Sequence, residues 1–113
     1  MTDPMTDALH RLTRAYPIAL MAYLAHPDEQ HLHSAYDLGR TALADKISLL
    51  ELTRIHRAAA GPILVTTTPA DLPATLEAAA AFQVEAISAY DMARSGFLEQ
   101  AGINAADDQT NRA

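Results

Sequence analysis

The residue best placed to do chemistry in this sequence is His56, which falls on a predicted helix among apolar neighbours. It follows Leu52 and Ile55 at helical spacing, so its ring is expected on the inward side of that helix. One hypothesis is a phosphoacceptor, as in histidine phosphotransfer domains, which usually keep a Lys and a Gly close after an exposed histidine. Here Arg57 and three alanines follow, and Gly61 comes only at the expected helix end. The sequence therefore favours a buried or interfacial histidine that is hydrogen-bonded across helices.

The remaining titratable side chains do not form a recognised metal or acid–base site. His31 and His33 are two residues apart, which directs them to different faces of a helix, whereas zinc requires several ligands that converge at about 2 Å. No His-x-x-x-His pair occurs, and single carboxylates at helical spacing are typical of a solvated surface. We therefore predict no catalytic residues, no metal ligands and no cofactor.

Length and composition indicate one small helical domain, which we place at residues 1–103, followed by a polar tail at 104–113 that we expect to be disordered. The chain has 113 residues, of which 50% are hydrophobic but only 5% aromatic, and its many alanines favour close contacts between helices. A net charge of −6 with scattered basic residues argues against nucleic-acid binding. With no cysteine and no visible signal peptide or membrane span, we expect a cytoplasmic protein without a membrane partner.

Periodicity and capping residues predict four helices, and hence an all-α four-helix bundle. The first is expected over about residues 5–25, with a kink at Pro17 or a restart there. The second is expected to begin with Pro27, Asp28 and Glu29 in its first turn, where acidic side chains meet free backbone amides.

Capping residues and helix breakers also define the later helices. Ser48 is predicted to cap the third helix, and Gly61-Pro62 is predicted to end it. Residues 63–65 would then attach a loop to the core, with a short strand as the alternative. The fourth and longest helix is expected from about residue 71 to about residue 100.

The first helix carries more apolar surface than one subunit needs. Beyond Pro17 it is apolar on a second side, where exposed side chains usually mark a partner site. The residues predicted to bind a partner there are Ile18, Met21, Ala22 and Ala25. The alternative is that the loop at residues 61–69 simply covers this side.

The fourth helix has a wide apolar arc that is interrupted by Gln83 and Arg94 beside Ile87 and Tyr90. A wide arc with polar interruptions fits a helix that packs on its own bundle and also on a second chain. We therefore predict a homodimer that forms through the long C-terminal helix.

The second helix predicts two contacts with its neighbours. Gly39 lies in mid-helix, which costs roughly 1 kcal/mol relative to Ala, so the close approach of another helix is the expected compensation. Arg40 borders the apolar stripe that contains Tyr36, and we expect it to pair with Glu85 of the fourth helix. We assign structural roles to these four residues and to His56.

Five short motifs follow one another in a recognisable order. They are Tyr23-Leu24, Ala35-Tyr36-Asp37-Leu38-Gly39-Arg40, Ser48-Leu49-Leu50-Glu51-Leu52, Ile55-His56-Arg57 and Glu85-Ala86-Ile87-Ser88-Ala89-Tyr90-Asp91-Met92-Ala93. Together they resemble the N-terminal domain of the stress-response phosphoserine phosphatase RsbU, over about residues 9–100.

The resemblance implies a four-helix domain that forms homodimers and shares its architecture with the C-terminal domain of the circadian clock protein KaiA. In the phosphatases, this domain receives the switch-kinase activator RsbT and passes the signal to a phosphatase domain. Carried over by position, the dimer interface would include Gln83, Ile87, Tyr90 and Arg94, and the second apolar side of the first helix would receive the partner. The sequence contains no phosphatase domain and no metal-binding aspartate set, so the resemblance implies no catalysis.

Three functions are therefore open. The favoured one is a non-catalytic dimeric regulatory domain that binds a switch kinase or another signalling protein in a bacterial partner-switching pathway for stress response. The rival is a histidine phosphotransfer protein that uses His56. The third, a small-ligand sensor, would require an apolar pocket lined by Tyr16, Tyr36 and His56.

Overall fold

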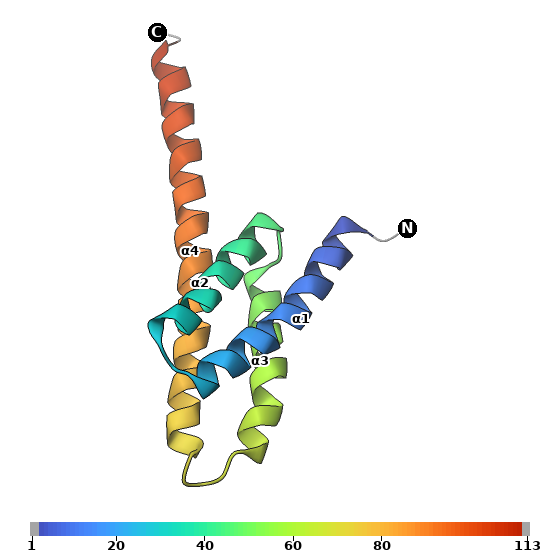
Figure 1. Ribbon diagram of the computed structural model, residues 1–113. Helices are drawn as coiled ribbons and strands as arrows, with labels where there is room; N and C mark the ends of the chain where they lie inside the picture. Colours follow the sequence, from blue (N-terminus) through green and yellow to red (C-terminus); the bar gives the residue numbers. More distant parts are fainter. Residues whose placement is uncertain (1–2, 112–113) are drawn as a thin grey trace.

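The computed structural model describes residues 3–111, with side chains for residues 3–100 and Gly102. These residues form four α-helices, whose bounds are Pro4–Ala25 (α1), Glu29–Ala44 (α2), Leu49–Thr66 (α3) and Leu72–Asn111 (α4). Figure 1 shows α3 and α4 joined by a short connection, with α1 and α2 lying across them. The C-terminal part of α4 projects beyond the other helices (Figure 1). The all-α bundle is therefore confirmed.

Side chains directly before the helices cap their first turns. Asp28 accepts a hydrogen bond from the backbone N–H of His31 at 2.8 Å, and the Ser48 hydroxyl accepts one from that of Glu51 at 3.1 Å. These bonds satisfy amides that have no partner within the helix. The predicted cap at Ser48 is confirmed. Pro27 precedes the capping residue of α2, so its expected place in the first turn is wrong.

Two prolines expected to interrupt helices lie inside them. The first helix runs through Pro17 without a restart, and α3 runs through Pro62. The predicted end of α3 at Gly61-Pro62 is therefore wrong, and the stretch expected as a loop or short strand is helical. A proline inside a helix costs about 3 kcal/mol because it removes a hydrogen bond and crowds a carbonyl. Ile63 and Leu64, however, pack against the core, and such packing outweighs the local preference for a break.

A Schellman-type turn ends α2, leads into α3 and contacts α4. The backbone N–H of Lys46 donates to the carbonyl of Leu43 at 3.0 Å, and that of Ile47 donates to the carbonyl of Ala42 at 2.8 Å. Lys46 has a φ of 61°, a left-handed conformation that favours glycine. Ile47 is buried, and its own carbonyl accepts the hydroxyl of Tyr90 at 2.9 Å. The turn therefore fixes α4 against the end of α2.

The last helix, α4, is longer than expected. It begins at Leu72, close to the predicted start, and continues to Asn111, beyond the expected end near Gln100. The backbone of residues 104–111 is helical, which differs from the aperiodic tail expected there, and residues 112–113 lie outside the described residues. The domain boundary drawn before that segment stays a prediction. Within the described part of the chain, none of the helices has the length and apolar content needed to span a membrane.

Aromatic rings form the centre of the core. Tyr16 and Phe82 are fully buried and meet edge to face, with ring centroids 5.3 Å apart. The ring of Tyr23 also packs against the ring of Phe82, with the two centroids 5.9 Å apart. Such aromatic pairs contribute about 0.5–1.5 kcal/mol beyond the burial of their area. Leu20 and Leu52 are also almost completely buried, so the rings and aliphatic side chains of different helices fill the interior together.

Gly39 allows α2 and α4 to approach closely, as the sequence predicts. A Cβ atom built on Gly39 would collide with the carbonyl oxygen of Ala86 and would lie 2.9 Å from its carbonyl carbon. Ala35 and Ala42, one turn away on each side, have no exposed surface. The contact between the two helices is therefore a strip of small residues that brings backbone against backbone.

Candidate protein-interaction site

The second apolar side of α1 is open in the structure. Ile18 is 71% exposed and Met21 is 59% exposed, Ala25 is exposed and Ala22 is half-buried. The alternative in which residues 61–69 cover this side is wrong, because the first part of that segment extends α3 instead of folding over α1. Exposed apolar side chains on successive turns form the kind of surface that partner proteins cover.

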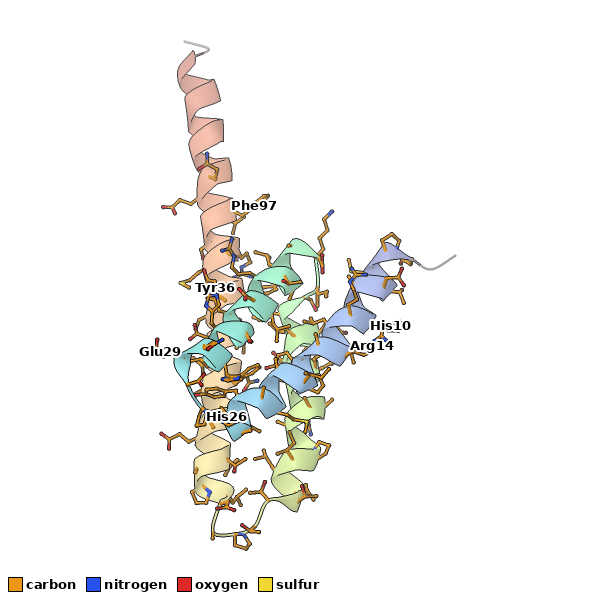
Figure 2. All side chains as sticks on the ribbon, viewed as in Figure 1. His10, Arg14, His26, Glu29, Tyr36 and Phe97 are labelled. Carbon is orange, nitrogen blue, oxygen red and sulfur yellow. The ribbon has the colours of Figure 1, made fainter. Side chains whose placement is uncertain are left out.

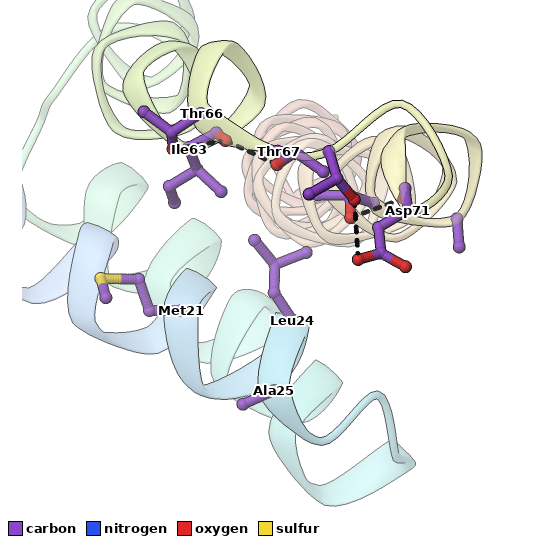
Figure 3. A pocket seen from close by; sticks show the side chains of 10 residues that line it. Met21, Leu24, Ala25, Ile63, Thr66, Thr67 and Asp71 are labelled. Carbon is purple, nitrogen blue, oxygen red and sulfur yellow. Dashed lines mark hydrogen bonds between the residues drawn. The ribbon is translucent and has the colours of Figure 1, made fainter.

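A groove of about 600 Å³ lies beside this side of α1. Met21, Leu24 and Ala25 form its α1 wall, and Ile63 lies opposite at the end of α3 (Figure 3). The Thr67 hydroxyl donates to the Ile63 carbonyl at 2.6 Å, so that wall is fixed by a side-chain hydrogen bond. The groove therefore offers apolar contacts on one wall and a more polar wall facing it.

The polar wall contains residues to which the sequence analysis assigned no role. Thr66, Thr67 and Thr68 line it together with Asp71, whose carboxylate accepts the Thr68 hydroxyl at 3.0 Å. A run of threonines before an acidic residue is typical of the start of a helix, so the sequence pattern alone indicates a helix start here. Its position beside α1 depends on α3 continuing through Pro62, which local rules do not predict.

The residues predicted for the dimer interface divide into two groups. Gln83 and Ile87 are half-buried, and Arg94 is exposed with its guanidinium 3.4 Å from Asp91. Tyr90 is only 7% exposed, and its hydroxyl is used within the protomer. Tyr90 is therefore mainly a core residue, and its place at a dimer interface stays a prediction.

Other apolar residues of α4 extend the exposed surface around Ile87. Leu76 is 47% exposed, Val84 62% and Leu98 61%. With Ile87 they recur at helical spacing along one side of α4. The described part of α4 thus carries an apolar stripe, defined by these four residues, that its own bundle leaves partly uncovered.

His56 is buried, as the sequence predicts, and its partner is Tyr16. The ring is 8% exposed, its Nδ1 lies 2.6 Å from the Tyr16 hydroxyl, and the two share a buried hydrogen bond. Burial lowers the pKa of His56 and raises the pKa of Tyr16 because it disfavours their charged forms. A phosphoacceptor must be reached by the phosphate of another protein, so this enclosed ring argues against phosphotransfer.

The space required by the hypothetical sensor pocket is filled. Tyr16 meets His56 at 5.6 Å and Phe82 at 5.3 Å between ring centroids, in edge-to-face contacts. Tyr36 lies on α2 (Figure 2), where its ring stacks on that of His33 with centroids 5.3 Å apart. Tyr16, Tyr36 and His56 therefore do not line a common cavity.

Arg40 has a different partner from the one expected. Its guanidinium carbon lies 5.8 Å from the centroid of the Tyr36 ring, a distance at which a cation is attracted to the face of an aromatic ring. The ion pairs among the described residues do not include Arg40 with Glu85. The predicted pair is therefore wrong, and Arg40 instead lies over an aromatic ring one turn earlier on the same helix.

Ion pairs of the described residues are local and lie at the surface. Asp28 contacts His31 at 2.6 Å, and His33 contacts Asp37 at 3.4 Å. The backbone amide and then the ring of His31 lower the pKa of Asp28 through hydrogen bonds. Within the described residues, no group of three or more His, Cys, Asp or Glu side chains is arranged to hold a metal ion.

Most of the four-helix bundle matches one known protein family. Residues 14–93 match the family described as the N-terminal domain of phosphoserine phosphatase RsbU. The chain belongs to this family. The matched segment extends from the middle of α1 to the middle of α4, so it contains Ile18, Met21 and Ile87. No curated protein and no solved structure matches the chain.

Membership of the RsbU N-terminal domain family identifies the kind of role that the bundle has. The family is a regulatory N-terminal domain and not the phosphatase domain itself. The resemblance inferred from the five motifs is thereby confirmed. Within this RsbU N-terminal-like domain, α1 and α4 both carry exposed apolar side chains.

Proposed function

We propose that this chain is a non-catalytic, dimeric regulatory domain that binds a signalling protein, with a switch kinase of the RsbT type as the preferred partner. The observation that carries the proposal is the match to the RsbU N-terminal domain family over residues 14–93. A regulatory domain acts by binding, and we place this one in the cytoplasm, in a stress-response pathway that operates by partner switching.

The open side of α1 supports the proposed partner site. Complete burial of an apolar side chain such as that of Ile18 or Met21 contributes about 1.5–3 kcal/mol. Both side chains project away from the core at present, so a partner would bury area that folding does not. The adjoining groove, with its threonine wall, would accept a neighbouring side chain of the same partner.

The apolar stripe of α4 supports the proposed dimer. Its residues are Leu76, Val84, Ile87 and Leu98, and it begins within the bundle and extends onto the projecting part of the helix. Two antiparallel or parallel copies of such a helix would cover each other's stripes. Charge at Ile87 would then separate the subunits without entering the aromatic core.

A double variant, Ile18→Glu with Met21→Glu, tests the partner site. Neither side chain contributes to the core, so the helix content and Tm should match those of the wild type. Affinity for a purified RsbT-type switch kinase, measured by isothermal titration calorimetry, should fall roughly tenfold or more, because two apolar contacts would be replaced by desolvated carboxylates.

The matched control is Leu50→Glu, which makes the same kind of change at a residue that is 59% exposed. Leu50 lies in the first turn of α3, where an acidic side chain is favourable, so this variant should bind the kinase as the wild type does. Wild-type protein that fails to bind the kinase, or a double variant that binds it unchanged, would contradict the proposal.

A further inference from the structure

A second cavity, of about 520 Å³, lies at the point where α4 leaves the bundle. It is bounded by α4, by the C-terminal half of α2 and by the turn that follows α2, and it is partly open to solvent. Its apolar lining consists of Leu43, Ala44, Ala93 and Phe97. Figure 2 shows Phe97 projecting from α4 beside the end of α2. The aromatic ring is 72% exposed, so it forms an open wall that a ligand would cover.

Three cations surround this apolar lining: Arg40, Lys46 and Arg94. They belong to three different segments, yet they meet at one cavity in a chain with only eight basic residues and a net charge of −6. A local positive site on an acidic molecule attracts anions to that place and repels them elsewhere. The cavity therefore combines an apolar surface with the charge that complements an anion.

Two of these cations have only weak competing partners. Arg94 lies 3.4 Å from Asp91, and both side chains are more than half exposed. Arg40 lies over the ring of Tyr36. Exposed contacts of this kind stabilise a fold only weakly, so either guanidinium can exchange its present contact for a ligand oxygen at little cost.

Lys46 occupies a position that favours glycine. Its φ of 61° places it in the left-handed region, which is sterically unfavourable for a residue with a Cβ atom. Glycine is the usual residue at this point of a Schellman turn. A lysine there gives up stability at a residue that lines the cavity, and strain of this kind is found at functional positions.

The end of α2 does not cancel this charge. The C-terminus of a helix carries partial negative charge on its free carbonyl groups. Here the carbonyls of Ala42 and Leu43 accept hydrogen bonds from the backbone N–H groups of Ile47 and Lys46. The repulsion that an anion would otherwise meet at this end of α2 is thereby reduced.

From these observations we infer that the cavity binds a small amphiphilic anion of the fatty-acid type. The acyl chain would lie along Leu43, Ala93 and Phe97, and the carboxylate would lie among the cations. The volume falls within the roughly 300–1,000 Å³ of small-molecule sites. The inference does not depend on partner binding by α1, and it gives the regulatory domain a chemical input at the junction of α2 and α4.

Laurate, below the concentration at which it forms micelles, is the probe. Calorimetry should show saturable binding of one laurate per chain, and two-dimensional NMR should place the largest amide shifts at Leu43, Lys46, Ala93 and Phe97. Dodecanol, which has the chain without the charge, and acetate, which has the charge without the chain, should both bind at least about tenfold more weakly. Dodecyl phosphate distinguishes carboxylate from phosphate recognition and should not bind more tightly than laurate.

Two variants separate binding from folding. Lys46→Gly should raise the free energy of unfolding, because it removes the left-handed strain, while weakening laurate binding about two- to fivefold. Phe97→Ser should weaken binding roughly tenfold through loss of the aromatic wall. Met92→Ser, at an exposed apolar residue of α4 outside the cavity lining, and Arg57→Gln, at an exposed cation of α3, should leave laurate affinity unchanged.

The outcomes also separate this inference from the proposed function. The Ile18→Glu, Met21→Glu variant should bind laurate normally. No saturable binding, equal affinity for dodecanol and laurate, tighter binding of dodecyl phosphate, or unchanged affinity in Lys46→Gly and Phe97→Ser would overturn the inference. So would a result in which an acidic amphipathic peptide shifts the cavity residues and laurate does not.

Discussion

Among single residues, Tyr16 and His56 form a buried polar contact. Their hydrogen bond joins α1 to α3, and both side chains are enclosed by the bundle. Such a bond contributes more by avoiding an unsatisfied buried group than by its own strength. The same enclosure removes the ring from contact with other proteins, so one physical fact accounts for both the structural role and the absence of an exposed phosphoacceptor at His56.

Burial of His56 predicts how stability depends on pH. Its pKa in the folded chain is lower than the usual value near 6.5 because burial disfavours the imidazolium. As pH falls below that usual value, the unfolded chain binds the proton first, so the free energy of unfolding should decrease until the folded form is protonated too. Urea unfolding at pH 7.5 and pH 5 should show this decrease.

His56→Gln provides the control, since a glutamine has no proton to gain in this range. Its free energy of unfolding should change less between the two pH values than that of the wild type, and an equal change would assign the effect to other groups. Asp28 does not interfere, because its pKa is lowered below its own usual value and its loss of charge belongs to more acidic conditions.

The sequence could predict the burial of His56 but not its partner. Leu52 and Ile55 lie on the same side of the helix at helical spacing, and this local pattern is enough to place the ring inward. Tyr16 is forty residues away in sequence, and only the packing of α1 on α3 brings it into contact. Tyr90 shows the opposite case, because its apolar arc predicted an outer surface while the turn at Ile47 accepts its hydroxyl inside.

For the helices, the contact between α2 and α4 depends on Gly39. Gly39→Ala should destabilise the fold by about 1–3 kcal/mol, because the new methyl group would meet the backbone carbonyl of Ala86. This loss would exceed the roughly 1 kcal/mol that Ala gains over Gly in a helix. Chemical denaturation followed by circular dichroism measures the difference.

Gly61→Ala is the matched control within the same bundle. Gly61 lies inside α3, and a Cβ atom there would have no neighbour within 4 Å, so the substitution should stabilise the protein by about 0.5–1 kcal/mol. If Gly39→Ala proved as stabilising as Gly61→Ala, then the close approach of α2 to α4 would not exist in solution.

The sequence predicted the number of helices and their order better than their ends. Caps such as Ser48 are local, and the structure places that cap as expected. The break expected at Pro62 is a local rule as well, but Ile63 and Leu64 lie against the core and keep the helix going. The threonine wall of the α1 groove exists because α3 continues through Pro62. A wrong end for α3 therefore also left this wall of the candidate site unpredicted.

The whole molecule presents three separate features on one small bundle. The open side of α1 lies next to the groove with the threonine wall, the apolar stripe runs along α4, and the cationic cavity lies at the junction of α2 and α4. The proposed function would use such a division, because a dimeric domain that binds a partner needs separate surfaces for its copy and for the other molecule. The long α4, which belongs to both the stripe and the cavity, connects two of the three.

Analytical ultracentrifugation shows whether the stripe of α4 joins two copies of the chain, as we propose. Wild-type protein at tens of micromolar should sediment as a dimer, and Ile87→Glu should sediment as a folded monomer. Met92→Glu makes a matched change at an exposed residue of α4 outside the stripe and should remain dimeric. A wild-type chain that is monomeric throughout, or an Ile87→Glu variant that stays dimeric, would contradict the account.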